Sequence, residues 1–267
     1  MLRVSTTALA VLLALVAALA PAAVRAGAWT LAPKEGLAIL TLRHLEAGER
    51  FDADGDLAPG GYAKTELAAY GEWGIAEGWT GVLGSTLQRK RVDGPPADAR
   101  TGLDYSFAGL RVRLAEGAWG VLSAQGTLRA PGATDASAPA QIGSTQWEAD
   151  GRLLFGRGGR IGGWHAFADL QLGWRHRAGA PPGEWRADAT FGLRPVPRAL
   201  LTAQLFRSDS DGSARPPFPE SRSLDAALAA AWDVAPAWTL QAGALGTLTG
   251  RATGREIGGF VALWRRF

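Results

Sequence analysis

Apolar and polar residues alternate at every second position, and this pattern constrains the fold more than any other feature of the sequence. In GWHAFADLQLGWRHRAG, residues 163–179, the even positions from Trp164 to Trp174 are all apolar, and polar residues such as Asp169 lie between them. The segments TQWEADGRLLF (145–155) and EWRADATFGLRP (184–195) repeat the alternation. A period of two places successive side chains on opposite faces of a strand. We therefore expect strands with one apolar face and one polar face.

The first 26 residues have the pattern of a secretory signal peptide. A positive start at Met1–Arg3 precedes the apolar run ALAVLLALVAALA, and the small-residue site VRA ends at Ala26. We expect cleavage there and a mature chain that begins near Gly27, with an uncleaved anchor as the alternative. The predicted organisation is a signal peptide at 1–26 and a single domain at 27–267.

Net charge and cysteine content exclude several classes of protein. Without Arg3 and Arg25 the mature chain has 26 basic and 25 acidic residues, which does not favour nucleic-acid binding. The chain has no cysteine, so disulfides and thiolate metal sites are excluded. After the signal, no apolar run reaches the ~18 residues that a membrane helix needs.

The alternating segments divide the mature chain into about twelve strands, an even number as bacterial single-chain barrels require. After even-numbered strands the links are short, as in AEG (76–78), VAPA (234–237) and GRGGRIGG (156–163). After odd-numbered strands they are long, as in GERFDADGDLAPGG (48–61). Short turns on one side and long loops on the other are typical of outer-membrane barrels, with the short turns periplasmic. The expected strand starts are Gly36, Tyr62, Trp79, Thr101, Ala118, Thr145, Trp164, Glu184, Ala199, Ser223, Trp238 and Arg255.

The predicted fold is therefore all-β: a single closed antiparallel transmembrane β-barrel of about twelve strands in the bacterial outer membrane, with a periplasmic N-terminus. Tryptophans near strand ends are expected to form a membrane girdle. A soluble β-sandwich is the alternative, but its polar face would meet bulk water, whereas here charges of both signs alternate with small residues. The girdle residues are Trp79, Trp164, Trp174, Trp185 and Trp238.

The polar faces predict a narrow, mixed-charge lumen, because twelve strands lie between a filled barrel and an open porin. Three aromatic residues on these faces, Tyr62, Tyr70 and Phe167, are candidates for stacking against sugar rings or for filling the lumen. The residues predicted to line the lumen and set selectivity are Lys64, Glu66, Glu72, Glu148, Asp150, Arg152, His165, Asp169, Arg175, Arg186 and Asp188.

Strand phase is ambiguous in the first, fourth, fifth and last strands. In the first strand, either the odd-numbered or the even-numbered residues could form the apolar face. In DYSFAGLRVRL, a bulge near Ala108 and Gly109 is expected to switch the apolar residues to the other face of the strand. Trp119 lies out of phase with its neighbours, and Phe260 and Trp264 point inward if Phe267 faces lipid.

The C-terminal segment IGGFVALWRRF resembles the last strand of bacterial outer-membrane β-barrel proteins, with terminal Phe267 and apolar residues at alternating positions before it. Arg265 departs from that spacing. The resemblance implies contact with outer-membrane lipid and lipopolysaccharide, and recognition by the barrel assembly machinery through this strand. The N-terminal segment GAWTLAPKEGLAIL is similar to XagA-like barrels associated with exopolysaccharide gene clusters.

No catalytic, cofactor or metal site is predicted. His44, His165 and His176 lack the His-x-Ser and Asn-Gly contexts of outer-membrane lipid hydrolases. Paired carboxylates such as Glu148 and Asp150 stand among arginines, which favours ion pairs in the lumen wall. DADGD (52–56) lacks EF-hand spacing and is expected to be a solvated turn, with a weak cation site as the alternative. GRGGRIGG is expected to be a turn, not a dinucleotide loop.

The function predicted from these features is passive transport of a polar solute or an exported polysaccharide. One alternative is a structural or adhesion barrel that acts through its outer loops, with Phe218 in SDSDGSARPPFPESR (208–222) as an apolar anchor. A lipid-modifying hydrolase at the rim is disfavoured by the histidine contexts.

Overall fold

The computed structural model describes residues 27–94, 96–132, 139–143, 145–179, 181–212 and 218–267. The predicted signal peptide lies outside the described residues, and its cleavage stays a prediction. No helix in the part of the chain that the structure describes is long and apolar enough to cross a membrane.

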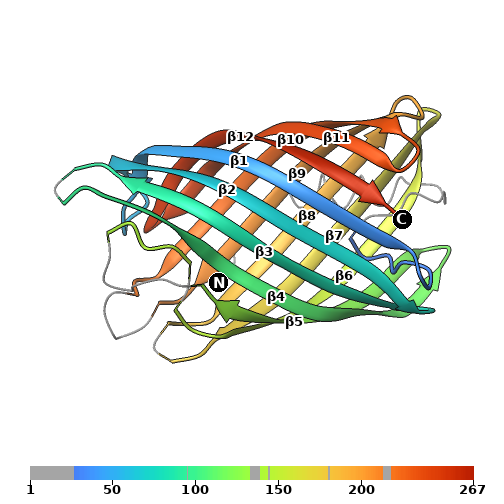
Figure 1. Ribbon diagram of the computed structural model, residues 1–267, viewed down its shortest axis with the longest axis horizontal. Helices are drawn as coiled ribbons and strands as arrows, with labels where there is room; N and C mark the ends of the chain where they lie inside the picture. Colours follow the sequence, from blue (N-terminus) through green and yellow to red (C-terminus); the bar gives the residue numbers. More distant parts are fainter. Residues whose placement is uncertain (1–26, 95, 133–138, 144, 180, 213–217) are drawn as a thin grey trace.

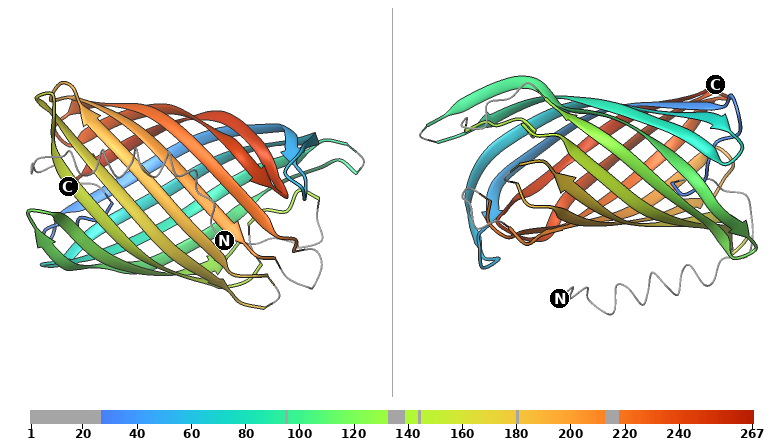
Figure 2. Two further views of the ribbon diagram at one scale, coloured as in Figure 1. Left: turned by 180° about the vertical axis from the view of Figure 1, so that it is seen from behind. Right: turned by 90° about the horizontal axis from the view of Figure 1, so that it is seen from below.

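Twelve antiparallel strands form a closed barrel in which each strand pairs with its neighbours in sequence and β1 pairs with β12 (Figures 1 and 2). Closure leaves no strand edge with unpaired backbone groups. The strands are β1 (Gly36–Phe51), β2 (Leu57–Ala76), β3 (Trp79–Val92), β4 (Asp98–Gly117), β5 (Gly120–Pro131), β6 (Glu148–Ile161), β7 (Trp164–Arg177), β8 (Glu184–Arg194), β9 (Ala199–Ser210), β10 (Ser221–Ala235), β11 (Trp238–Arg251) and β12 (Thr253–Arg266).

The predicted number of strands is confirmed, and every predicted start lies within about five residues of the observed one. Two predicted links are wrong in extent. The loop GERFDADGDLAPGG shortens to residues 52–56, because β1 and β2 stay paired from Glu49–Pro59 to Phe51–Leu57. GRGGRIGG is strand as far as Ile161, because Gly158 and Gly159 pair with β7.

Only Gly162 and Gly163 form the turn between β6 and β7, with φ of 56° and 87°. Both values lie in the left-handed region, which glycine enters without steric cost, so this pair suits a two-residue hairpin turn. We call this end of the barrel the turn end and the opposite end the loop end.

The barrel is apolar outside and polar inside. Leu228 and Ile257 are 67% and 71% exposed on the outer face, whereas Glu66 and Asp169 are 5% and 2% exposed. A soluble protein has the opposite arrangement, because most of its large apolar side chains are buried in the interior, away from water. The outer face therefore matches contact with lipid, as the sequence predicts.

The predicted girdle tryptophans lie at both ends of the barrel. Trp79, Trp164 and Trp238 begin strands that leave short turns. Trp174 and Trp185 lie near the loop end, where their ring centroids are 5.0 Å apart. Aromatic belts at both interfaces are typical of transmembrane barrels.

The ambiguous strand phases are resolved in the structure. In β1, Leu40 and Leu42 are exposed outside and Ile39 lines the interior, so apolar residues occupy both faces. Trp119 is a turn residue, exposed and stacked on Phe155 with ring centroids 6.0 Å apart.

In β4 the predicted position of the face change is wrong. Leu103 is exposed outside while Tyr105 lines the interior, and the ladder with β3 skips Asp104 between them. This extra residue forms a bulge, so odd-numbered side chains point outward before it and inward after it. The change of face thus lies five residues before Gly109. In β12, Trp264 lines the cavity, and so does Phe267, which stacks on Trp73 with ring centroids 5.8 Å apart.

An arginine in the middle of the outer face should weaken the barrel more than one near its end. Leu228 lies at the centre of β10, and Leu248 lies near the loop end of β11. We expect Leu228→Arg to lower the free energy of unfolding in lipid bilayers by about 2–4 kcal/mol, and Leu248→Arg by about 0–1 kcal/mol, because the cost depends on depth in the bilayer. Equal losses in equilibrium denaturant titrations would contradict contact with lipid.

Candidate functional site

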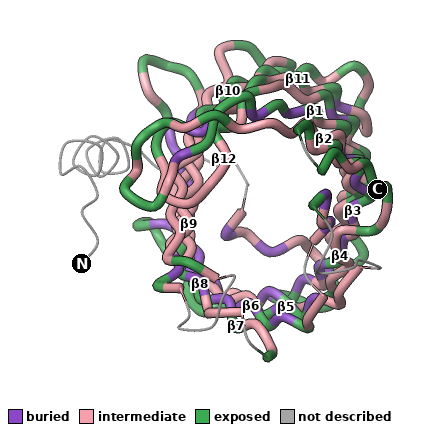
Figure 3. The backbone as a smooth tube through the Cα atoms, turned by 90° about the vertical axis from the view of Figure 1, so that its left-hand side faces the viewer, coloured by how far each residue is buried: buried purple, intermediate pink, exposed green. Residues whose placement is uncertain are grey.

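The segment 27–35 lies inside the barrel, where the view along the axis shows it within the ring of strands (Figure 3). Ala28 is fully buried, and its N–H donates to Asp169 Oδ2 of β7 at 2.7 Å. Its carbonyl accepts a hydrogen bond from Ser123 Oγ of β5 at 2.5 Å. Leu31 N–H donates to Thr80 Oγ1 of β3 at 2.8 Å. Three strands thus hold the segment by hydrogen bonds in the lumen.

The segment reaches the wall again at the turn end. Lys34 N–H donates to the Gly74 carbonyl at 2.8 Å, and Gly74 N–H donates to the Glu35 carbonyl at 2.9 Å. Trp29 packs directly over Gly156 of β6, where a Cβ would overlap the indole ring. Glycine at this position lets the segment lie close to the wall.

Sequence reasoning missed this segment. It treated residues 27–35 as an entry into the first strand, and the only local signal was the uncharged stretch GAWTLAP, residues 27–33, between the signal peptide and Lys34.

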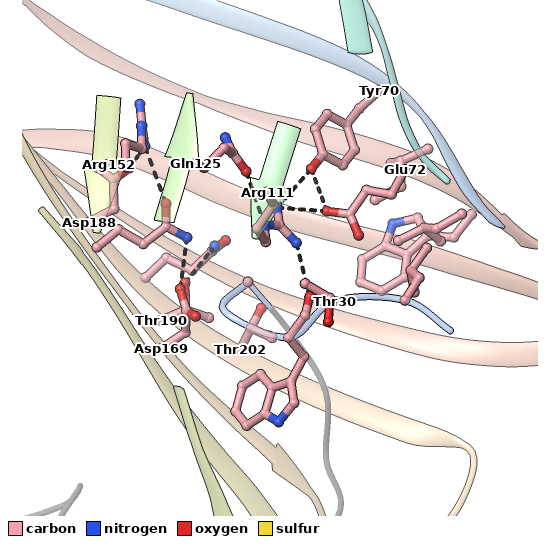
Figure 4. A pocket seen from close by; sticks show the side chains of 18 of the residues that line it. Thr30, Tyr70, Glu72, Arg111, Gln125, Arg152, Asp169, Asp188, Thr190 and Thr202 are labelled. Carbon is pink, nitrogen blue, oxygen red and sulfur yellow. Dashed lines mark hydrogen bonds and ion pairs between the residues drawn. The ribbon is translucent and has the colours of Figure 1, made fainter. Parts of the chain in front are cut away.

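A cavity of about 1,090 Å³ lies beside the segment (Figure 4). Its charged lining comprises seven arginines and five carboxylates, so positive charge is in slight excess. They are Arg111, Arg129, Arg152, Arg175, Arg186, Arg194 and Arg266, and Glu35, Glu72, Asp150, Asp169 and Asp188.

Arg111 of β4 joins the segment to the wall. It is 4% exposed and lies 2.9 Å from Glu72 Oε1, and it donates to Gln125 Oε1 at 3.0 Å and to the Trp29 carbonyl at 3.2 Å (Figure 4). The Tyr70 hydroxyl lies within 3.3 Å of the same guanidinium and donates to Glu72 at 2.5 Å. A buried guanidinium with this many acceptors is held in one position.

A second group of charges crosses β6, β7 and β8. Arg152 lies 2.6 Å from Asp150 and 2.7 Å from Asp188. It also donates to Gln171 at 3.3 Å, and the amide of Gln171 donates to Asp169 at 2.8 Å. These bonds hold the side chains in a connected row along the wall (Figure 4).

A third group lies nearer the loop end and has spare hydrogen-bonding capacity. Glu148 lies within ion-pair distance of Arg129, Arg175 and Arg177, at 3.1, 3.6 and 3.3 Å. Among the described residues, the buried Nε atoms of Arg129 and Arg175 have no hydrogen-bond partner. Unused donors in a wet lumen can bond to water or to a passing solute.

Among the residues that the structure describes, none of those lining the middle of the opposite wall is charged. Thr202, Gln204 and Phe206 of β9, Gln241 of β11 and Trp264 of β12 line it. Along the middle of the barrel the cavity is therefore charged on the side of β4 to β8 and neutral on the side of β9 to β12, whereas Glu72 of β2 and Arg266 of β12 lie nearer the turn end.

The structure brings most of the predicted lumen residues together. Glu72, Asp150, Arg152, Asp169, Arg175, Arg186 and Asp188 line the cavity, as do Tyr70 and Phe167. Glu148 is not part of the lining, but it lies 3.6 Å from Arg175, which is.

The other predicted lumen residues lie outside the cavity lining. Lys64 and Glu66 form a separate cluster, in which Lys64 lies 2.7 Å from Glu256 and the Tyr62 hydroxyl donates to the same carboxylate at 2.6 Å. His165 lies at the turn end within 3.2 Å of Arg160, because β7 begins only one residue earlier.

His44 on the outer face touches a hydroxyl and a carboxylate. Its Nδ1 lies 2.8 Å from Thr65 Oγ1, and its Nε2 lies 3.5 Å from Glu46 Oε1.

The DADGD segment is a turn organised by its first aspartate. Asp52 Oδ1 accepts the N–H of Asp54 at 2.9 Å and the N–H of Asp56 at 3.0 Å. These bonds, chiefly the one from Asp54, hold the pKa of Asp52 below its usual value. In the described part of the chain, no acidic, histidine or cysteine residues gather as metal ligands.

No protein-family model matches the chain, and no curated protein matches it. Among solved structures, the COG4313 outer membrane channel from Pseudomonas putida F1 superposes with a TM-score of 0.68 and 15% identity, over 92% of this chain and 100% of that one. The translocator domain of the autotransporter NalP from Neisseria meningitidis gives 0.53 and 13%, over 89% and 90%. The fold is therefore that of a bacterial outer-membrane β-barrel, which confirms the predicted fold class. The similarity to XagA-like proteins stays a prediction.

Removing the Arg111 guanidinium should destabilise the barrel by leaving Glu72 buried without its cation. We expect Arg111→Met to lower the free energy of unfolding by about 3–5 kcal/mol. Glu72→Gln in the same chain should restore part of that loss, because the uncompensated charge is gone. Denaturant titration of both variants in lipid vesicles tests this, and a double variant no more stable than the single one would contradict the assignment.

Proposed function

We propose that the protein is a narrow outer-membrane channel that passes a small polar solute or an extended polysaccharide by diffusion. The observation that carries the proposal is the cavity of about 1,090 Å³ inside the barrel, lined by charges of both signs. Transmembrane barrels generally have polar interiors, and here the interior also contains unfilled volume that a solute could enter. The likeness to a barrel described as an outer membrane channel supports this.

We place the turn end in the periplasm and the loop end outside the cell, as the short and long connections of outer-membrane barrels are arranged. Segment 27–35 then enters the lumen from the periplasmic side. The barrel assembly machinery would recognise the C-terminal strand, which precedes Phe267. The outer face would contact lipid and lipopolysaccharide.

The two walls of the cavity suit an elongated polar solute. Arginines on β5 to β8 offer donors to hydroxyl or carboxylate oxygens. Aromatic side chains nearby, including Tyr70 and Phe107 with ring centroids 6.2 Å apart, offer flat apolar surfaces to sugar rings. Diffusion along such a wall exchanges hydrogen bonds with water for hydrogen bonds with protein.

A barrel that acts through its outer loops is the second candidate, and segment 27–35 favours it because the segment occupies part of the lumen. Phe218, its proposed anchor, borders residues 213–217, which lie outside the described residues. Transport predicts ionic conductance, whereas a plugged barrel predicts none.

Charge reversal at Arg186 tests the channel. Arg186 lines the cavity, and its Nε has no hydrogen-bond partner among the described residues. In planar bilayers we expect stepwise conductance with a slight preference for anions, and Arg186→Glu should move the reversal potential toward cation selectivity, because it removes the excess of positive charge from the lining.

The control is Arg91→Glu, a side chain that is 65% exposed, pairs with Asp93 at the loop end and does not line the cavity. It should shift selectivity less than Arg186→Glu. A folded barrel that shows no conductance would overturn the channel and favour the loop-acting barrel.

A further inference from the structure

Asp169 is a buried carboxylate without a cationic partner in the described part of the chain. It is 2% exposed, and it accepts hydrogen bonds from the side-chain amide of Gln171 and the backbone N–H of Ala28. The other buried acidic residues among those described each pair with arginine or lysine: Glu66, Glu148, Asp150 and Glu184. A buried carboxylate is costly unless a positive charge compensates it.

The backbone of Gly27 lies against this carboxylate. A Cβ built on Gly27 would overlap the Asp169 side chain, and the φ of Gly27 is 58°. Glycine is therefore required here both for space and for conformation. The nitrogen of Gly27 is bonded to the Cα from which that Cβ would project, so covalent geometry places it within about 5 Å of the same carboxylate.

The predicted cleavage site immediately precedes this residue. Signal peptidase would hydrolyse the peptide bond between Ala26 and Gly27, with water supplying the hydroxyl of the new carboxylate and a proton of the new amine. The amine would be an ammonium at neutral pH, because a free α-amino group has a pKa of about 7.7–8.0. Processing would therefore create a cation at the place where Asp169 lacks one.

We propose that the α-ammonium of mature Gly27 pairs with Asp169 inside the lumen and locks segment 27–35 in place. The bond from Ala28 N–H to the same carboxylate would align the pair, and the bonds from Ser123 and Thr80 fix the rest of the segment. In the unprocessed chain the nitrogen is an uncharged amide, so the lock forms only after export. The ligand of Asp169 is thus the chain's own amino terminus.

Reactivity of the amino terminus tests the lock. The full chain would be expressed with its own leader, purified from outer membranes and treated at pH 7 with an amine-reactive N-hydroxysuccinimide ester. Mass spectrometry would then measure the rate at which the N-terminal peptide is labelled. We expect the folded protein to label at least about tenfold more slowly than the denatured chain, because a hydrogen-bonded ion pair must open first.

Asp169→Asn should abolish most of that protection, whereas Asp233→Asn should retain it, because Asp233 pairs with Arg194 at 3.2 Å and does not line the cavity. Heat-modified migration on gels would show that both variants are folded. If Asp169→Asn does not fold, a chain refolded with Gly-Ser-Gly before Gly27 gives the same test: the lock predicts that its new terminus labels at the denatured rate.

Three results would overturn the lock: a mature chain that does not begin at Gly27, a folded wild-type terminus that labels as fast as the denatured one, or equal protection in Asp169→Asn and wild type. The channel is tested separately. If the terminus is protected but the barrel does not conduct, the lock is supported and the proposed channel function is contradicted. If the barrel conducts but the terminus is not protected, the channel function is supported and the lock is contradicted.

Discussion

Every strand of this barrel crosses an environment that offers its backbone no water, so each N–H and C=O must bond to a neighbouring strand. Pairing of β1 with β12, from Leu37–Arg266 to Phe51–Thr253, meets this requirement by removing both edges of the sheet. Closure also separates the lipid outside the barrel from the water inside it. Because successive side chains of a strand point to opposite faces, leucines such as Leu228 face lipid and carboxylates such as Asp150 face the interior.

The interior is held by paired charges rather than by a hydrophobic core. Arg111 and Arg152 each contact a carboxylate and a glutamine amide, and the first also binds the backbone of segment 27–35. Such networks fix side-chain positions when every member is satisfied. They also leave the cavity beside the segment, on which the proposed transport depends.

Strand positions were predictable because lipid and lumen impose a local pattern that each segment displays by itself. Prediction failed where a residue's place depends on distant partners. The bulge at Asp104 depends on pairing with Thr86 and Leu87 of β3. Segment 27–35 is held by Thr80 and Asp169, which lie 49 and 141 residues from the groups they bind. Most lumen residues followed from parity alone, but their sorting into one charged and one neutral wall required the closed barrel.

We propose that the lumen conducts ions and that residues 27–35 narrow it. The most direct test compares single-channel conductance of the mature chain with that of a chain lacking residues 27–34, which retains Glu35 and its bond to Gly74. We predict stepwise conductance in both proteins and a larger step in the truncated one, because the segment no longer occupies the lumen. Equal steps, or a truncated barrel that is folded but silent, would contradict the account.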